Sequence, residues 1–582
     1  MRCKSWAIGS FISILGFIIM VHTDLRSADK KAIQEKLPEI EKLLSSVSHP
    51  KYPGFIVGLF FDGEPLFKKC YGQANMELNV PISESTLFNI GSTAKQFTAM
   101  AVVLLAQQKK LSLDDDIRTY IPEMPDFKEA IIIRHLIYHT SGMRDWIEGF
   151  LLGGHKAEDS FTHEEIIKKF ILSQRALNFD PGDEFLYCNS GYSLLAEIIS
   201  RVSGMTFRRW MEDNILSPLN MKNTYVADDH HMILPNRADA YNISNKGEVS
   251  RAILNGSILG AGGMYTTLDD LAKWAFNFEE AKLGGVDTIR QMNEAGKLND
   301  GTSLDYAFGQ YIYDLNGLRL YSHGGQGAGW QAGLIRCPEQ KFVFIILANN
   351  SKLNMNIVFP ILNILFQDQF KRKAGAPKRE QFAYQEAGIS PLILEEYAGR
   401  YWESSTVAYT VCHLGDHLTI RRSGQPPVAY FPASAKDFLD KKGEANNKVS
   451  FNRDESGNVI SITLENTEEE RCRTAKKIRS LVTVRKSDNV RGEVNLNEFC
   501  GEYVNDELGA MYSLAVSGDK LVAKHHWGEE IVMIHECFDF FCGDRFWARD
   551  IEFIRDEGGK VTGFNLTGSR IANVRFDKIT VQ

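Results

Sequence analysis

Ser92 and Lys95 are the side chains in this sequence whose types and spacing best fit nucleophilic chemistry. Residues three apart in a helix share a face, so the Lys95 amine can reach the Ser92 hydroxyl and accept its proton. We expect Ser92 to open a helix, where free backbone N–H groups and the positive dipole end stabilise an oxyanion. The next stretch, Phe97–Ala106, is apolar nearly all round, which indicates burial and a lowered lysine pKa. The pair therefore predicts acyl transfer, with Ser92 as nucleophile and Lys95 as base.

The Ser-x-x-Lys pattern has little specificity by itself. It also occurs from Ser48 to Lys51, where Pro50 argues against a helix. Taken alone, Ser92 is better explained as a helix N-cap and Lys95 as a solvated side chain. The prediction of a site therefore depends on residues elsewhere in the chain.

A Tyr-x-Asn pattern at Tyr187 and Asn189 supplies two such residues. A tyrosine near a lysine can share its proton and pass it to a leaving group, and an asparagine can hold both the lysine and a substrate amide. The alternative is a turn tyrosine with a capping asparagine, and Tyr503 and Asn505 repeat the pattern elsewhere. We expect Tyr187 to be a third catalytic residue and Asn189 to bind substrate.

His323, Gly325 and Gln326 follow an expected strand, Arg319–Ser322. Glycine lets a substrate backbone approach a strand closely, and the Gln326 N–H can face an oxyanion. His323 can bind a carboxylate or orient the network around Tyr187, and a histidine in a surface turn is the alternative. We expect substrate contacts from His323, Gly325 and Gln326.

In this order, Ser-x-x-Lys, Tyr-x-Asn and His-x-Gly resemble the motifs of the serine β-lactamase and penicillin-binding protein superfamily, over about Leu37 to Phe366. The chain is most similar to the class C β-lactamase-related branch of D-aminopeptidases, DD-peptidases and esterases. True class C lactamases usually carry Lys-Thr-Gly as the third motif, whereas this chain has His323 there. The resemblance implies peptidase or esterase activity, with weak or absent β-lactamase activity. Supporting stretches are Leu113–Asp116, Ile133–Leu136, His139–Gly142, Gly260–Met264 and Asp270–Ala272.

The apolar patterns around these motifs predict an α+β domain, with an antiparallel sheet flanked by helices. A helix is expected over Asp29–Ser46 and another from Thr93 to about Lys110, and helices and loops dominate up to about Phe278. Because strand patterns occur only at the two ends of this region, distant segments must complete one sheet. The expected strands are Gly54–Phe61 and Leu66–Tyr71, joined at Asp62-Gly63, and then Arg319–Ser322, Gln331–Arg336 and Phe342–Leu347.

The second half of the chain contains an internal repeat. Ten positions recur at one constant offset, from 394 and 496 to 459 and 561 (496 − 394 = 102; 561 − 459 = 102). A period this long indicates two tandem domains, and many short strands in each favour small antiparallel barrels. We expect a β-lactamase-like hydrolase domain over 29–370, a linker over 371–390, and two all-β barrels over 391–490 and 491–582.

The two barrels resemble the paired lipocalin-like domains of D-aminopeptidases of the same superfamily. That resemblance implies that a loop of the last barrel reaches the catalytic cleft. No motif marks the loop in this sequence. The segments His525–Trp527 and Cys537–Cys542 are candidates by their chemistry, with turn residues and core thiols as the alternatives.

Net charge, the N-terminal segment and the cysteines limit the cellular compartments and the binding partners that we expect for this protein. The 582 residues carry a net charge of -8, with a pI of about 6.0, so there is no basic field for nucleic acid. Arg2 and Lys4 precede an apolar run that predicts a signal peptide over 1–28 and a secreted or periplasmic protein, with an uncleaved anchor as the alternative. The nine cysteines lack the short spacings of metal sites, so we expect no metal and no cofactor. Most should be buried free thiols, although Cys537 and Cys542 can pair.

Together these residues predict a serine hydrolase that works through an acyl-enzyme on Ser92. The expected activity is that of a D-aminopeptidase or a DD-carboxypeptidase-like enzyme acting on small peptides, which include cell-wall peptides. One alternative is a carboxylesterase of the same superfamily. Another is a catalytically weak protein that binds cell-wall peptides or another protein, but a pure binder has no need of the whole set Ser92, Lys95, Tyr187 and Asn189.

Overall fold

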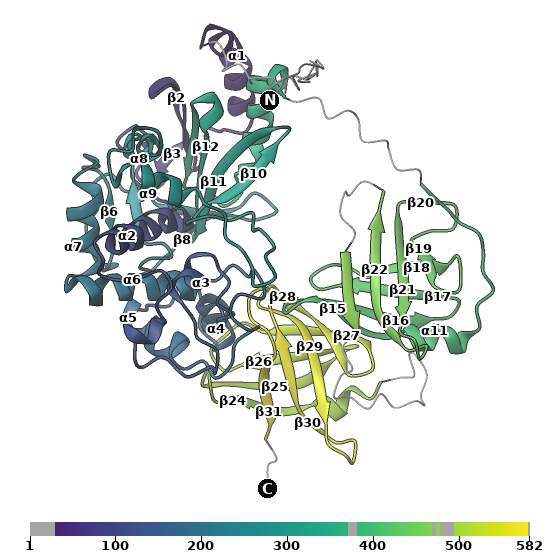
Figure 1. Cartoon of the computed structure of the whole chain (residues 1–582). Helices are drawn as coiled ribbons and strands as arrows, with labels where there is room; N and C mark the ends of the chain where they lie inside the picture. Colours follow the sequence, from purple (N-terminus) through teal and green to yellow (C-terminus); the bar gives the residue numbers. More distant parts are fainter. Residues whose placement is uncertain (1–29, 371–380, 468–472, 478–493, 580–582) are drawn as a thin grey trace, which may run out of the picture.

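The computed structural model describes residues 30–370, 381–467, 473–477 and 494–579. It places them in an α+β domain and two closed β-barrels (Figure 1). The second barrel lies between the α+β domain and the first barrel and contacts both, through Tyr512 on one side and Glu536 on the other. The expected signal peptide, the first half of the expected linker and the expected boundary between the barrels at 490 lie outside the described residues.

Six antiparallel strands form the sheet of the first domain, in the order β10-β11-β12-β13-β1-β2. Strand β1 pairs with β13 along its whole length, from Phe55 opposite Ala348 to Phe61 opposite Phe342. Segments almost three hundred residues apart are thus neighbours, which confirms the expected α+β class. The strands are β1 Phe55–Phe61, β2 Glu64–Tyr71, β10 Tyr311–Leu315, β11 Leu318–Gly327, β12 Trp330–Cys337 and β13 Phe342–Ala348.

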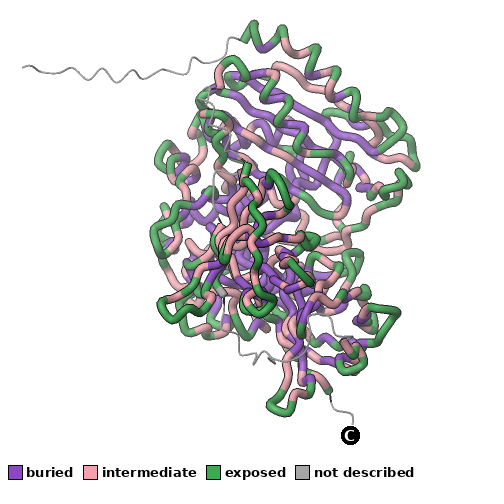
Figure 2. The backbone as a smooth tube through the Cα atoms, turned by 90° about the vertical axis from the view of Figure 1, so that its right-hand side faces the viewer, coloured by how far each residue is buried: buried purple, intermediate pink, exposed green. Residues whose placement is uncertain are grey.

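Helices cover both faces of this sheet because β1 and β13 are apolar and buried on both sides. Ile40 of α1 and Ile361 of α10 belong to the buried cluster on one face. Leu268 of α8 and Phe97 of α2 belong to the larger cluster on the other. Figure 2 shows buried backbone running through the sheet and the helices beside it. These helices are α1 Lys30–Ser46, α2 Lys95–Gln107, α8 Leu268–Glu280 and α10 Val358–Phe366.

Helix α2 and helix α6 (Asn189–Ser203) form the centre of the helical half. Every residue of α2 up to Leu105 is buried, as its apolar sequence predicts. The helix that Ser92 is expected to open begins as a 3₁₀ turn, Gly91–Ala94, and becomes the α-helix α2 only at Lys95. The other α-helices of this domain are α3 Ile133–Ile137, α4 Trp146–Leu152, α5 His163–Glu165, α7 Phe207–Met211 and α9 Gly285–Met292. Three small sheets complete it. The first pairs β3 Gln73–Asn75 with β4 Val80–Pro81, the second has the order β5 Phe88–Asn89, β9 Met264–Thr266 and β6 Tyr225–Val226, and the third pairs β7 Ala240–Ile243 with β8 Val249–Ala252.

Strand β11 is longer than the sequence predicts. The expected strand ends at Ser322, whereas β11 continues through Gly327. The pairing with β12 is possible because small residues face each other there, with Gly324 opposite Gly333. The three residues predicted to contact substrate after this strand therefore lie within it.

Two closed eight-stranded antiparallel barrels follow, which confirms the expected all-β second half. In each barrel the last strand pairs back with the first, β23 with β15 and β31 with β24. The first barrel contains β15 Gly399–Ser404, β16 Val407–Leu414, β17 His417–Arg422, β18 Val428–Pro432, β19 Asp437–Leu439, β21 Asn447–Arg453, β22 Val459–Asn466 and β23 Arg473–Lys477, with α11 Pro391–Tyr397 before it and β14 Phe382–Ala383 paired with β20 Glu444–Ala445. The second contains β24 Gly501–Asn505, β25 Ala510–Ser517, β26 Lys520–His525, β27 Ile531–Cys537, β28 Phe540–Arg545, β29 Ala548–Arg555, β30 Val561–Thr567 and β31 Val574–Lys578.

Residues that recur at the offset of 102 form the same contacts in both barrels. Arg453 binds Glu396 at 2.7 Å in the first barrel, and Arg555 binds Glu498 at 2.8 Å in the second. Each arginine also donates to the backbone carbonyl four residues after it. These bonds join the segment before the first strand to a late hairpin, so the repeated pattern marks one contact that both barrels make.

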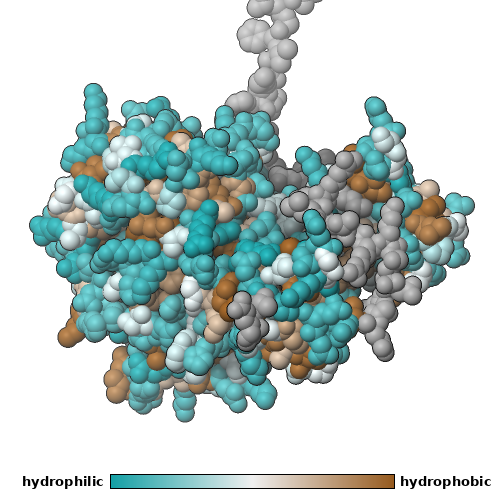
Figure 3. All heavy atoms as spheres, turned by 90° about the horizontal axis from the view of Figure 1, so that it is seen from below, coloured by the Kyte–Doolittle hydropathy of each residue, from teal (hydrophilic) through white to brown (hydrophobic). Residues whose placement is uncertain are grey.

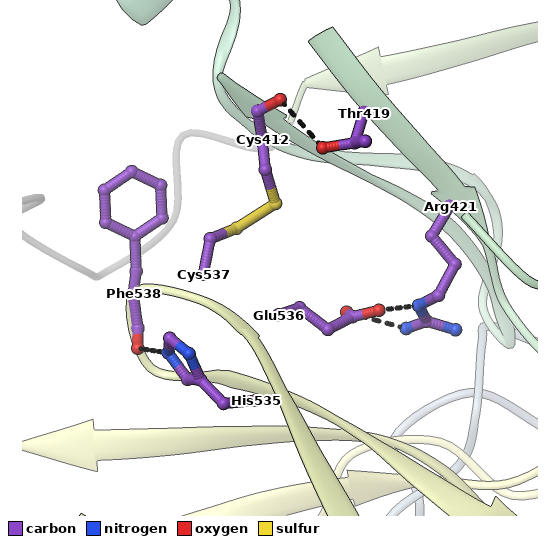
Figure 4. The surroundings of a disulfide bond; sticks show 7 residues. All are labelled: Cys412, Thr419, Arg421, His535, Glu536, Cys537 and Phe538. Atoms are coloured by element: carbon purple, nitrogen blue, oxygen red, sulfur yellow. Dashed lines mark hydrogen bonds and ion pairs between the residues drawn. A yellow bond between two sulfur atoms is a disulfide. The ribbon is translucent and has the colours of Figure 1, made fainter. Parts of the chain in front are cut away.

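A disulfide between Cys412 of β16 and Cys537 of β27 joins the two barrels (Figure 4). The pairing of Cys537 with Cys542, which the sequence left open, does not occur: Cys542 is a free thiol that lies opposite a different residue of β27. Arg421 of the first barrel lies beside the disulfide and binds Glu536 of the second (Figure 4). A covalent bond and a buried ion pair therefore hold the barrels together.

The face of the molecule seen in Figure 3 is mostly hydrophilic, and its hydrophobic side chains form small separate patches. The described residues contain no helix with both the length and the hydropathy that a membrane crossing requires. Among the described residues, apolar side chains gather mainly in the cores of the α+β domain and of the two barrels.

Candidate active site

Ser92 and Lys95 lie together, as their spacing predicts. Ser92 is on the 3₁₀ turn Gly91–Ala94 and Lys95 is the first residue of α2, with 3.0 Å between Lys95 Nζ and Ser92 Oγ. Lys95 is completely buried, whereas Ser92 is partly exposed. A substrate can therefore reach the hydroxyl while the amine stays out of water.

Burial lowers the pKa of Lys95 well below its ordinary value of 10.5, because a buried ammonium loses its hydration. The Asp145 carboxylate raises the pKa and the Arg570 guanidinium lowers it, and both effects are smaller than that of burial. The amine is therefore neutral under conditions in which an exposed lysine is charged.

Three oxygen atoms surround the Lys95 amine: Ser92 Oγ at 3.0 Å, Asn189 Oδ1 at 2.8 Å and the Ala261 carbonyl at 2.8 Å. The amide and carbonyl oxygens can only accept hydrogen bonds. A neutral amine has two protons, and these satisfy Asn189 and Ala261. Its lone pair is then left facing Ser92, whose hydroxyl can donate to it. The arrangement fits a base that takes the Ser92 proton.

Asn189, at the start of α6, is oriented by Asp145. Asp145 Oδ2 accepts from the Asn189 backbone N–H at 2.7 Å and from its Nδ2 at 2.8 Å, and Oδ1 caps α4 through the Ile147 N–H at 2.9 Å. Because the amide nitrogen faces Asp145, the amide oxygen must face Lys95. Substrate binding by the second Nδ2 proton stays a prediction.

Tyr187 lies in the loop before α6, and the centre of its ring is 4.8 Å from Lys95 Nζ. Its hydroxyl oxygen is buried, and burial raises its pKa far above the ordinary value, although the neighbouring Ser92 hydroxyl opposes the rise. A tyrosine in these surroundings keeps its proton. It is therefore suited to protonate a leaving group and unsuited to act as the base.

A chain of hydrogen bonds links His139, Tyr306 and His323 beside the site. His139 Nδ1 accepts from the Cys188 backbone N–H at 3.0 Å, so neutral His139 carries its proton on Nε2 and donates it to the Tyr306 hydroxyl at 3.1 Å. Tyr306 donates to His323 Nε2 at 3.2 Å, and His323 Nδ1 donates to the Gly324 carbonyl at 2.6 Å. Every bond has one donor and one acceptor when both histidines are neutral.

Burial keeps these histidines neutral, since it lowers the pKa of His139 well below the ordinary value and that of His323 to about 3. His323 is only 3% exposed and both of its ring nitrogens are engaged. The ring of His139 lies 4.3 Å from that of Tyr187. This geometry favours a positioning role for His323 through the ring network, and a direct contact with a substrate carboxylate stays a prediction.

Strand β11 passes directly over the turn that carries Ser92. A Cβ atom on Gly325 would lie 1.8 Å from the Ile90 carbonyl oxygen, and one on Gly91 would lie 2.7 Å from Gln326 N. Gly325 has no side chain, and this lets the backbone of β11 contact the backbone of the Ser92 turn. The sequence predicts a different reason for the glycine, the close approach of a substrate backbone. The contact brings the Gln326 N–H beside the Ser92 turn, and its part in an oxyanion hole stays a prediction.

Substituting Gly325 with alanine is expected to destabilise the protein by about 3 kcal/mol, because the backbones of β11 and the Ser92 turn must separate. Gly324→Ala is the matched control, since a Cβ atom there meets only the Ala332 carbonyl oxygen, at 3.6 Å. Urea unfolding followed by tryptophan fluorescence compares the two variants. Equal midpoints for both would contradict the close contact.

A loop of the second barrel, residues 568–573 between β30 and β31, forms another side of the site. The Arg570 N–H donates to Glu148 at 2.9 Å, and the Arg570 carbonyl accepts from Asn178 at 3.1 Å. The guanidinium group lies 4.8 Å from the centre of the Tyr187 ring and 3.9 Å from Asp145 Oδ2. The loop implied by the family resemblance therefore exists, and it carries a cation.

The candidates suggested for this loop by the sequence lie elsewhere. The His525 ring packs against Gly154, Trp527 is 72% exposed, and Cys537 is bonded to the first barrel. No sequence pattern distinguishes Arg570 or Asp145, which look like an ordinary turn residue and an ordinary helix N-cap. His139 and Ala261 do have a signal, because they fall within the stretches His139–Gly142 and Gly260–Met264 that support the family resemblance.

Known families match both halves of the chain. The sequence model of the family described as Beta-lactamase matches residues 40–364, more than half of the chain. A second model, described as Domain of unknown function (DUF3471), matches residues 384–476, which contain helix α11, the described strands β15 to β22 and most of β23. The solved structure of the octameric penicillin-binding protein homologue from Pyrococcus abyssi shares this fold, with a TM-score of 0.52, 24% identity, and coverage of 76% of this chain and 100% of that chain.

Several relatives match half of this chain or more. Penicillin-binding protein 4* of Bacillus subtilis (strain 168) is 25% identical over 434 residues, which cover 71% of this chain and 93% of that protein. D-aminopeptidases of Gluconobacter oxydans (strain 621H) and Brucella anthropi are each 26% identical, over 51% and 54% of this chain and 56% and 59% of their own length. The matches thus span little more than half of those D-aminopeptidases. The family match over more than half of the sequence and the assembled Ser92 site lead to one conclusion: the chain belongs to the β-lactamase family of serine hydrolases.

Proposed function

We propose that this protein hydrolyses D-amino-acid peptides or amides through an acyl-enzyme on Ser92. The observation that carries the proposal is the Lys95 amine, whose two protons are taken by Asn189 and Ala261 so that its lone pair faces Ser92. A binding protein has no use for a buried neutral amine beside an accessible hydroxyl. The relatives named D-aminopeptidase support D-amino-acid derivatives as the substrate class.

In the proposed reaction, Ser92 Oγ attacks the substrate carbonyl carbon while its proton passes to Lys95. The N–H groups of Ser92 and Gln326 stabilise the oxyanion, and one such donor contributes about 3–4 kcal/mol. Tyr187 gives its proton to the leaving nitrogen as the C–N bond breaks, and Lys95 returns a proton to Tyr187. A water molecule then attacks the acyl ester, and the same groups release Ser92 and the acid product.

The same groups can serve a carboxylesterase, since an ester releases an alcohol where a peptide releases an amine. We expect weak or absent β-lactamase activity, because a buried neutral histidine, His323, stands where class C lactamases carry a lysine. The choice between peptide and ester therefore depends on the leaving group that the cleft accepts.

We also propose that the protein works in an oxidising compartment, secreted or periplasmic, where it meets small peptides such as those of the cell wall. The disulfide between Cys412 and Cys537 supports this, since such bonds persist outside the reducing cytosol. The net charge of -8 does not favour nucleic acid as a partner.

Covalent trapping tests the proposed function. A fluorophosphonate added to the purified full chain is expected to give one adduct, which mass spectrometry assigns to the peptide containing Ser92. Ser92→Ala should give no adduct, whereas Ser48→Ala, at the second copy of the pattern, should label fully. A panel of D-Ala amides, D-Ala-D-Ala peptides, L-peptides, short esters and a cephalosporin then ranks substrates. Absence of the adduct on folded protein would overturn the proposal.

A further inference from the structure

The guanidinium group of Arg570 contacts Asp145 and the Tyr187 ring, but it donates no hydrogen bond within the described part of the chain. Its ion pair with Asp145 Oδ2 has a length of 3.9 Å, which is too long for a hydrogen bond. The Asp145 oxygens are already occupied, Oδ2 by two bonds from Asn189 and Oδ1 by the Ile147 N–H. Arg570 therefore keeps its donors for another acceptor, and its side chain is 38% exposed.

The backbone on both sides of this guanidinium is fixed to the α+β domain. Beside the bonds of Arg570 itself to Glu148 and Asn178, the Ser569 hydroxyl donates to Glu148, and the Ala572 N–H donates to Asn178 at 2.8 Å. A loop whose only task is to connect two strands has no need of so many bonds to another domain. The bonds hold Arg570 at a set position beside the Tyr187 ring.

Arg570 also stays charged beside the Tyr187 ring, since its pKa is raised although burial opposes the rise. Burial makes Lys95 and His323 neutral, and both of these side chains already have their hydrogen-bond partners. The neighbouring Arg144 is buried and bound to both carboxylate oxygens of Glu507 at 2.8 Å.

We propose that Arg570 binds the free carboxylate of the leaving amino acid, so that the preferred substrate is a peptide cleaved next to its C-terminus. This inference rests on the proposed acyl transfer at Ser92. Tyr187 protonates the leaving group, so a cation beside the Tyr187 ring lies on the leaving-group side of the scissile bond. The planar guanidinium fork matches the two oxygens of a carboxylate. A leaving group that carries an ammonium there is repelled, and one that carries a neutral amide gains no charge-assisted bond.

Two substrates that differ in one group test the proposal: acetyl-D-Ala-D-Ala and its C-terminal amide. The wild-type protein should cleave the free acid with the higher kcat/KM. Arg570→Ala should lower the ratio of acid to amide roughly 10- to 100-fold, mainly through KM for the acid, which is the effect of one hydrogen bond to a charged group. Arg570→Lys should restore part of the ratio. Arg575→Ala is the matched control, since Arg575 lies on β31 just after the loop and binds Asp577 of the same strand.

Fluorophosphonate labelling of Ser92 is measured on every variant beside these ratios. A labelled Arg570→Ala protein whose acid-to-amide ratio equals that of the wild type would overturn the role of Arg570 and leave acyl transfer intact. A wild-type protein that cleaves the amide as fast as the acid would overturn it without any variant. Failure of the wild type to label would instead overturn the proposed function itself.

Discussion

Replacing Lys95 with methionine is expected to lower kcat/KM on D-amino-acid amides by about 10⁴-fold or more, the scale seen when a base that acts together with its nucleophile is removed. Methionine fills a similar volume in the buried position, but it offers no lone pair to Ser92. Lys95→Arg should be equally inactive for a different reason, since a guanidinium stays protonated and cannot accept the Ser92 proton. Circular dichroism and thermal unfolding confirm the fold of each variant. Activity within tenfold of the wild type would show that Lys95 is not the base.

The pH profile of the wild-type protein is a second test of the same assignment. Lys95 acts as a base only when neutral, and burial lowers its pKa well below 10.5, so the active form appears at a lower pH than it would for an exposed lysine. We expect kcat/KM to fall as the pH drops through this lowered pKa and to stay level above it. Tyr187 causes no loss on the alkaline side below its ordinary pKa of 10.0, because its own pKa is raised. Activity that appears only near pH 10.5 would contradict the assignment.

Breaking the ion pair between Arg144 and Glu507 is expected to have the largest effect on stability, about 3–5 kcal/mol. The pair joins the loop before α4 to the second barrel, and its side chains are only 9% and 7% exposed. Glu507→Ala leaves the guanidinium of Arg144 buried without its counter-charge, which costs more than the pair itself contributes. The docking of the second barrel should weaken with it, and the loop that carries Arg570 should then be displaced from the site.

An exposed pair in the same barrel provides the control for this prediction. Lys524 and Glu530 lie 2.9 Å apart with side chains more than half exposed, so Glu530→Ala should cost at most about 1 kcal/mol. Urea unfolding of the two variants, together with hydrolysis of D-Ala amide, separates the effects. A Glu507→Ala protein that unfolds at the same urea concentration as Glu530→Ala would contradict the buried link between the domains.

Local chemistry was sufficient to predict much of the fold. The turn at Asp62-Gly63 has φ values of 52° and 78°, which a two-residue hairpin of this type requires and which this residue pair tolerates. The repeat at 102 residues predicts two equal barrels, because a contact such as that of Arg453 with Glu396 has to be made again in the second copy. The Ser-x-x-Lys pair could be found because its local spacing brings the two side chains together, and the Tyr-x-Asn and His-x-Gly patterns distinguished it from the second copy at Ser48.

The parts that the sequence did not predict depend on contacts between distant residues. The disulfide joins cysteines 125 residues apart, and no local spacing marks them as partners. The extension of β11 depends on the Ser92 turn beneath it, where Gly325 meets Ile90. Arg570 belongs to the site only because the second barrel docks on α4. The residues next to Arg570 in the sequence give no indication that it lies beside Tyr187.

Loop 568–573 has a consequence for the order in which the protein becomes functional. A ribosome completes Ser92, Lys95 and the whole six-stranded sheet long before it reaches residue 570. Until the second barrel has been made, folded and docked, the side of the site that loop 568–573 forms is missing. The Cys412–Cys537 bond has the same timing, since its second cysteine also comes late. The nascent chain therefore contains the residues that attack a carbonyl, Ser92 and Lys95, early in synthesis. Arg570, the residue that selects among leaving groups, is added almost last.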